Sequence, residues 1–281
     1  MIKIFIVFAS ILAIAFYFLR DQTAPASKAM KSDTNKFETL ATLPGAIQES
    51  SGIEIMSENG NYLTHNDANN KPYLYEINEA GKLIKTHKFQ LPNVDWEDLT
   101  RDDSGNLYIG DIGNNNSKRD ELAIYKVSLQ DMENPQAIRF TYEDYKGKPS
   151  KKDKSSFDCE AIFWYDGNLY LISKDRNGRN EAKVYQLSDE PGNHTAKKIG
   201  TVKMREPVTG ASISPDGSTV ALLSEGKIHL YRNVENPESF FEGESEEIQL
   251  SGAGQTEAVT FKDNNTLILT SEGGSLFRYT L

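Results

Sequence analysis

The fold can be predicted from one segment, Trp96-Glu97-Asp98-Leu99-Thr100-Arg101-Asp102-Asp103-Ser104-Gly105-Asn106-Leu107-Tyr108-Ile109. Two short apolar runs enclose Asp103-Ser104-Gly105, and Asp and Gly are residues that tight hairpin turns favour. A third run, Ile124-Tyr125-Lys126-Val127, follows, and a fourth extends from Ala137 to Tyr142. The segment therefore predicts an antiparallel unit of four short strands.

The same unit recurs along the chain. First strands are predicted at Ser51-Gly52-Ile53-Glu54-Ile55, Trp96-Glu97-Asp98-Leu99-Thr100, Cys159-Glu160-Ala161-Ile162-Phe163, Thr209-Gly210-Ala211-Ser212-Ile213 and Thr256-Glu257-Ala258-Val259-Thr260. Equivalent third-strand residues are Tyr75, Tyr125, Tyr185, His229 and Phe277, at spacings of 50, 60, 44 and 48 residues. Periods near these values, with four short strands each, are typical of β-propeller blades.

The repeats predict an all-β fold, a five-bladed β-propeller over residues 36–281. The fifth unit stops at Leu281, directly after its third strand. We expect Phe37 to Leu43 to supply the missing outer strand, which would close the last blade and leave no open edge. A single repeat cannot bury its apolar face alone, so one cooperative domain is expected.

The N-terminus has a different composition. Residues 1–20 contain an unbroken apolar run from Ile4 to Leu19, and residues 21–35 read as a flexible tether. Sixteen residues at ~1.5 Å each span roughly 24 Å as a helix, which suits a signal peptide or a short membrane anchor. Both alternatives predict export, with the folded body in the periplasm or at the cell surface. The membrane is a partner if the segment is uncleaved, and the protein is secreted if it is cleaved.

Charge and cysteine content exclude several classes of protein. The formal net charge is −10 and the pI is about 5.0, which argues against nucleic acid as a partner because such binding needs a basic face. Cys159 is the single cysteine, so no internal disulfide can form. Its neighbours Asp158 and Glu160 disfavour a reactive thiolate.

Carboxylates gather at one predicted mouth of the propeller channel. Glu97, Glu160 and Glu257 share one frame of the first strands, and Asp67 and Asp111 lie at the ends of second strands. If neighbouring strands are antiparallel, all five carboxylates meet at the same mouth. Oxygen ligands of this kind suit Ca²⁺ or Mg²⁺ better than Zn²⁺. The alternative is structural: the carboxylates accept hydrogen bonds from backbone N–H groups of neighbouring blades.

Further candidates for ligand contact lie beside this acidic mouth. They are His65, Asn66, Trp96, Lys174 and Arg176. By contrast, the recurrent aromatic residues Tyr75, Tyr125, Tyr185 and Phe277 are expected to be core between blades, since they repeat at one blade position.

A set of motifs resembles a known group of proteins. The motifs are Thr64-His65-Asn66-Asp67, Asp95-Trp96-Glu97-Asp98-Leu99, Leu107-Tyr108-Ile109-Gly110-Asp111-Ile112-Gly113-Asn114-Asn115, Asp158-Cys159-Glu160-Ala161-Ile162, Val208-Thr209-Gly210-Ala211 and Thr256-Glu257-Ala258. Together they resemble uncharacterised exported bacterial propellers near the SdiA-regulated and phytase-like, NHL-type proteins. The resemblance implies an acidic, Ca²⁺-binding channel. The chain departs from β-propeller phytases in its blade count and in lacking a Lys/Arg cluster that could grip a polyphosphate.

Three functions are compatible with these features. The first is an exported, membrane-tethered binding module for a small ligand, a glycan or a protein. The second is a metal-dependent hydrolase of a phosphoester, lactone or ester, in which the channel carboxylates hold a cation. The third is a glycosidase that uses two channel carboxylates as acid and base or nucleophile.

Overall fold

The computed structural model describes residues 30–31, 36–56, 60–115, 117–147, 157–174, 178 and 180–281. The predicted segment 1–20 and most of the tether 21–35 therefore lie outside the described residues. Among these described residues, the regular structure is β apart from one short 3-10 helix, η1 (Pro237–Glu242). Within the described part of the chain, no helix is long and apolar enough to cross a bilayer.

The strands form antiparallel meanders that follow the sequence repeats. The first is β3 (Ser50–Ile55), β4 (Tyr62–Asn66), β5 (Tyr73–Ile77) and β6 (Leu83–Lys88). The next is β7 (Trp96–Arg101), β8 (Asn106–Asp111), β9 (Leu122–Ser128) and β10 (Gln136–Tyr142). It is followed by β11 (Cys159–Tyr165), β12 (Asn168–Ser173), β13 (Glu181–Ser188) and β14 (Gly192–Lys203). The parallel pairing of β10 with β14 joins these last two meanders into one eight-stranded sheet.

Two further meanders complete the molecule. One is β15 (Val208–Ile213), β16 (Thr219–Ser224), β17 (Lys227–Arg232) and β18 (Ser245–Gln249), with the two-residue β1 (Met30–Lys31) paired in parallel on β18. The other is β19 (Thr256–Asp263), β20 (Thr266–Ser271) and β21 (Ser275–Thr280). Strand β2 (Phe37–Thr42) pairs antiparallel with β21, so the predicted closing strand is confirmed.

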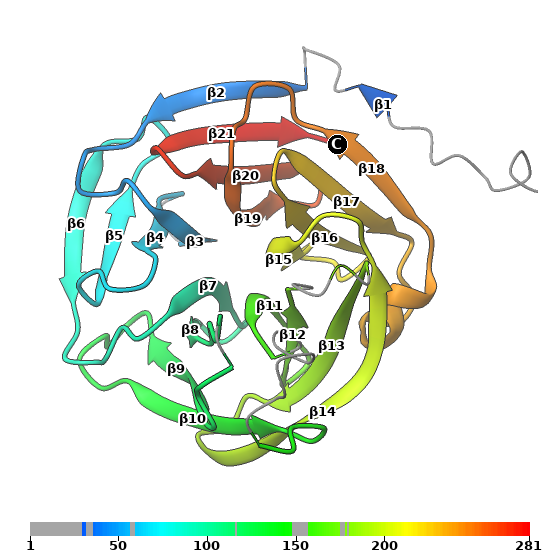
Figure 1. Ribbon diagram of the computed structural model, residues 1–281. Coiled ribbons are helices and arrows are strands. Elements are labelled where there is room, and N and C mark those ends of the chain that lie inside the picture. Colours follow the sequence, from blue (N-terminus) through cyan, green and yellow to red (C-terminus); the bar gives the residue numbers. More distant parts are fainter. Residues whose placement is uncertain are drawn as a thin grey trace, which may run out of the picture.

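The meanders are arranged around a common centre. Figure 1 shows the first strand of each meander, β3, β7, β11, β15 and β19, innermost. Each of these strands contacts the next, and β19 contacts β3, so the inner strands form a closed ring. The described chain is an all-β, propeller-like fold.

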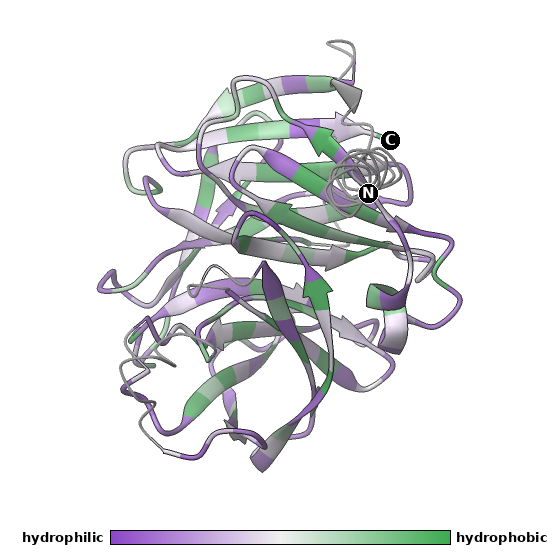
Figure 2. Cartoon of the chain, turned by 45° about the vertical axis from the view of Figure 1, so that its right-hand side comes forward, coloured by the Kyte–Doolittle hydropathy of each residue, from purple (hydrophilic) through white to green (hydrophobic). Residues whose placement is uncertain are grey.

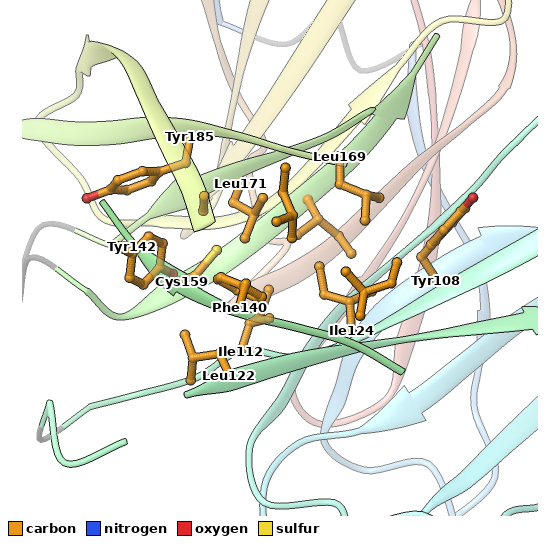
Figure 3. Close-up of a cluster of buried hydrophobic side chains, with 14 of the residues drawn as sticks. Tyr108, Ile112, Leu122, Ile124, Phe140, Tyr142, Cys159, Leu169, Leu171 and Tyr185 are labelled. Atoms are coloured by element: carbon orange, nitrogen blue, oxygen red, sulfur yellow. The ribbon is translucent and has the colours of Figure 1, made fainter. Parts of the chain in front are cut away.

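Apolar side chains fill the spaces between successive sheets. Figure 2 shows that hydrophobic residues concentrate along the strands. One cluster, drawn in Figure 3, packs Ile112, Ile124 and Phe140 of one meander against Leu169 and Leu171 of the next. The predicted inter-blade residues are buried as expected, and they are Tyr75, Tyr125, Tyr185 and Phe277. Burial between sheets makes each meander depend on its neighbours.

Candidate functional site

The pairing of first and second strands brings two sets of polar residues to one end of the ring. In each meander these strands are antiparallel, so the start of the first lies beside the end of the second. A cavity of about 200 Å³ lies at this end. We call it the acidic mouth, and its charged lining includes Asp67, Glu97, Glu160, Lys174 and Glu257.

A backbone irregularity directs the glutamates into this cavity. The strand register skips one residue at the same place in every first strand, namely at Ser51, Glu97, Glu160, Thr209 and Glu257. Such a β-bulge places an extra residue in one strand and re-aims its side chain. Four of the five bulged residues line the cavity, namely Ser51, Glu97, Glu160 and Glu257. The fifth, Thr209, donates its hydroxyl to the Thr256 carbonyl at 2.8 Å.

Two groups of carboxylates approach closely enough to share a cation. One oxygen each of Asp67, Asp95 and Glu97 lies within 4.8 Å of the others, and the same holds for Glu97, Asp158 and Glu160. Glu97 belongs to both groups and is only 5% exposed. It is therefore the centre of the acidic mouth.

Hydrogen bonds hold the surrounding acids in place. Asp158 Oδ1 accepts from the backbone N–H of Asn114 at 2.6 Å. Asp111 Oδ1 accepts from the backbone N–H of Asp95 at 3.0 Å and pairs with Arg119 at 2.9 Å. Asp111 thus positions Asp95 and is itself neutralised by Arg119.

One lysine enters the acidic mouth. Lys174 Nζ donates to Glu160 Oε2 at 3.0 Å, and the positive charge also lowers the pKa of Glu257 relative to what burial alone would give. Acidic side chains nevertheless outnumber basic ones in the lining of the cavity, because Glu49, Asp67, Glu97, Glu257 and Glu272 line it as well.

The pKa values reflect this crowding. Burial raises the pKa of Glu97 well above its usual range, and the negative charges of Glu160, Asp67, Asp95 and Asp158 raise it further. Burial likewise raises the pKa of Asp95 to about 6 and that of Glu257 to about 7. A cation bound beside these carboxyls would stabilise their ionised forms, which burial has removed from water.

Gly113 gives the carboxylates room. A Cβ atom at this position would lie 2.0 Å from Glu97 Oε1 and 2.4 Å from Asp95 Oδ2. The backbone of Gly113 is held there by its N–H bond to the Asp95 carbonyl at 3.1 Å. The glycine in the motif around Asp111 therefore permits the close approach of two acids.

The donor set fits a hard divalent cation. Both triads consist of carboxylate oxygens, which Ca²⁺ and Mg²⁺ prefer, and Zn²⁺ would favour imidazole or thiolate ligands. His65 and Cys159 cannot supply those ligands from their positions, because both side chains are fully buried away from the cavity lining.

The predicted site residues separate into two sets. Glu97, Glu160, Glu257, Asp67 and Lys174 line the acidic mouth together. Asp111 adjoins it through its bond to Asp95 but does not line the cavity. Arg176 lies outside the described residues.

The remaining predicted contacts lie beneath the surface. Trp96 and His65 are fully buried and pack edge to face at 5.5 Å, so their positions give no support to direct ligand contact. Burial also lowers the pKa of His65 to about 4, which keeps the ring neutral. Asn66 accepts from the Glu49 N–H at 3.3 Å and donates to the Ala46 carbonyl at 2.9 Å, so it fixes the segment that precedes β3.

Sequence reasoning missed Glu49 and gave too little weight to Asp95 and Asp158. All three precede their bulged residue by two positions, and Asp95 and Asp158 belong to the close-approach triads. Aligning the repeats on the bulge would have found Glu49, because Ser51 occupies the position of Glu97 and Glu160.

Comparison with known proteins gives the fold and no further identification. No family model and no curated protein matches the chain. A solved structure provisionally named a gluconolactonase aligns over 87% of this chain and 92% of its own, at 11% identity and a TM-score of 0.51. A streptogramin B lyase aligns over 87% of both chains at 13% identity and a TM-score of 0.46. The virginiamycin B lyase of Staphylococcus aureus aligns over 86% of this chain and 69% of its own at 15% identity and a TM-score of 0.43. At 11% identity, the likeness to the first of these structures shows the fold alone.

Proposed function

We propose that this chain is an exported, membrane-tethered, five-bladed β-propeller that binds Ca²⁺ at its acidic mouth and acts as a binding module. The observation that carries the proposal is the convergence of two carboxylate triads on Glu97 in one cavity. Glu97 would hold the cation with Asp67 and Asp95, or with Asp158 and Glu160. A bound cation would supply positive charge for an oxygen-bearing ligand, such as a small molecule, a glycan or a protein carboxylate.

Several features support the finer parts of the proposal. Each of the five inner strands starts a meander, and β2 completes the last one, which favours five blades in one domain over residues 36–281. The apolar run from Ile4 to Leu19 and the segment 21–35 favour export and a tether. The motif resemblance to SdiA-regulated and phytase-like propellers favours Ca²⁺ as the cation.

The first test is calcium binding by the full-length chain, purified in a mild detergent. Ca²⁺ bound only to the native state should raise the midpoint of thermal unfolding, and EDTA should reverse the rise. Glu97→Gln should abolish this rise because it removes the carboxylate shared by both triads. The matched control is Glu246→Gln, which makes the same charge change on the outer strand β18, at a side chain that is 37% exposed and paired with Arg232.

Gly113→Ala provides a second test that keeps every carboxylate. Its Cβ would push Glu97 and Asp95 apart, so calcium affinity should fall by roughly tenfold or more, as for a misplaced ligand. Gly45→Ala is its control, since the nearest atom to a Cβ there is 3.7 Å away. If Ca²⁺ leaves the unfolding midpoint of the unmodified protein unchanged, the calcium proposal is wrong and the acids serve the structure alone.

One observation favours a second function, a metal-dependent hydrolase. Glu257 lines the same cavity, and its pKa of about 7 would let it exchange a proton near neutral pH, as a general acid or base must. In that case, Glu257→Gln should retain calcium binding and lose calcium-dependent hydrolysis of a test ester or lactone. Calcium binding without any such hydrolysis would leave the binding module as the function.

A further inference from the structure

A second cavity lies at the opposite end of the inner strands. Its volume is about 360 Å³, and its lining includes residues from the second half of the first strands, namely Glu54, Arg101, Trp164 and Thr260. Along β7, Arg101 is four residues beyond Glu97, which corresponds to roughly 13 Å of strand. We call this cavity the rear mouth.

A buried residue separates the two mouths. Asp98 is fully buried, and its Oδ2 accepts from the backbone N–H groups of Ile162 at 2.9 Å and Ala211 at 3.3 Å. These bonds join β7 to β11 and β15 between the two ends. The rear mouth is therefore a separate cavity and not the base of the acidic mouth.

Glu54 offers an unused oxygen at the rear mouth. The side chain of this residue is about nine-tenths buried, with 9% exposed. Its hydrogen bonds from Ile55 N–H at 2.7 Å and Thr260 Oγ1 at 2.8 Å, and its approach to Arg101 Nε at 3.6 Å, all fall on Oε1. Glu54 lines the cavity, and within the described part of the chain none of these contacts involves its Oε2, which can therefore accept from a ligand there.

The charges around the rear mouth favour a cation over an anion. Arg101 is the basic residue in its lining, and Asp103, Asp166 and Asp216 add three exposed carboxylates from three different turns. The lining thus contains four acids and one base. Such an excess raises the local concentration of positively charged ligands.

The same lining disfavours a bare metal ion. Among the described residues, the groups of three close metal-ligating side chains all lie at the acidic mouth. Trp164 and Tyr165 also contribute aromatic surface to the rear mouth, and the indole N–H of Trp164 already donates to Asp189 Oδ2 at 2.8 Å. Aromatic carbon beside carboxylates suits an organic cation with an aliphatic stem.

We propose that the rear mouth binds a small aliphatic amine of the polyamine class. An ammonium group would bond to Glu54 Oε2, the chain would lie along Trp164 and Tyr165, and further ammonium groups would pair with the aspartates of the rim. This site is distinct from the acidic mouth and does not depend on the proposed calcium function.

The test uses spermidine as the probe and isothermal titration of the full-length protein in detergent at low salt, with saturating Ca²⁺. The pH is set to about 8, where Glu54, with a pKa raised by burial to about 7, is mostly ionised. Spermidine should bind the unmodified protein, and Glu54→Gln should weaken binding by roughly tenfold or more through loss of a charged hydrogen-bond partner. Asp166→Asn, at the exposed rim, should weaken binding only a few-fold. Glu246→Gln, on the outer strand β18, which contributes to neither cavity lining, should leave spermidine binding unchanged.

Four outcomes would overturn the proposal. The first is no measurable spermidine binding. The second is equal binding by the unmodified protein and by a Glu54→Gln variant whose circular dichroism shows a native fold. The third is binding that occurs only without Ca²⁺, because spermidine would then occupy the acidic mouth. The fourth is tighter binding of glucose or inorganic phosphate, which serve as neutral and anionic probes, because it would contradict the assignment of an amine.

Discussion

At the scale of single residues, Glu54 gives the clearest pH dependence. Burial raises the pKa of Glu54 from 4.5 to about 7, although Arg101 opposes the rise. The folded protein therefore holds a proton that the unfolded chain releases above about pH 4.5. The stability that this residue contributes is fully present below that pH and is lost as the pH rises through about 7.

The matching prediction compares the unmodified protein with Glu54→Gln, which cannot ionise. The difference between 4.5 and about 7 corresponds to about 3 kcal/mol at 1.36 kcal/mol per pKa unit. Relative to Glu54→Gln, the unmodified protein should therefore lose up to about 3 kcal/mol of unfolding free energy between about pH 4 and about pH 8. Urea unfolding at both pH values measures this, and the other titrating carboxyls cancel because both proteins contain them. If the free energy of unfolding changes with pH in the same way for both proteins, Glu54 does not have a raised pKa.

The residues of the acidic mouth could be predicted only where the repeat itself contains them. Glu97, Glu160 and Glu257 were found because they occupy one frame of the first strands. The bulge that re-aims them is a feature of the backbone, and no single residue type marks it. His65 and Trp96 adjoin the acidic motif in sequence, yet alternation along the strand turns them into the space between sheets.

At the scale of elements, the segment between β2 and β3 connects the last meander to the first. Ile47 is fully buried in a cluster with Ile268 and Leu276 on one side and Ile53 and Tyr62 on the other. Removal of the Ile47 side chain would leave a cavity between the two sheets that close the ring.

Ile47→Ala should therefore lower the free energy of unfolding by roughly 2–5 kcal/mol, as for other large-to-small changes in a core. Ile84→Ala is the control, because Ile84 on β6 is 49% exposed, and it should cost no more than about 0.5 kcal/mol. Equilibrium unfolding in urea compares the two variants. Similar losses in both would show that the segment does not stabilise the closure.

Most strands could be predicted from the sequence, and the connections between sheets could not. The first, second and third strands lie where alternating apolar runs and turn residues placed them, and the closing strand from Phe37 was confirmed by its pairing with β21. The parallel pairing of β10 with β14 was not predicted. Local patterns record which face of a strand is buried, and they carry no signal for which outer edges of neighbouring meanders meet.

At the scale of the whole molecule, the ring is joined across its centre as well as around its rim. Asp98 bonds the first strands of three meanders together, and its fully buried carboxyl has a pKa raised well above its usual range by burial. Contacts between β19 and β3 close the inner ring, and the pairing of β2 with β21 closes the last meander at the rim. No meander can open without exposing the core of two neighbours, so the domain should unfold as one unit.

Asp98→Ala tests this cooperativity. The change leaves the buried N–H groups of Ile162 and Ala211 without their acceptor, which lowers the free energy of unfolding by roughly 1–3 kcal/mol for each unsatisfied group. Because burying a carboxyl is itself unfavourable, its removal offsets part of this loss. The variant should therefore unfold at a lower urea concentration than the unmodified protein.

Far-ultraviolet circular dichroism and the fluorescence of Trp96 and Trp164 should still report one coincident transition in both proteins. Separate transitions in the unmodified protein would mean that the meanders fold independently. Separate transitions in the variant alone would mean that Asp98, and not the closure at the rim, couples the meanders into one domain.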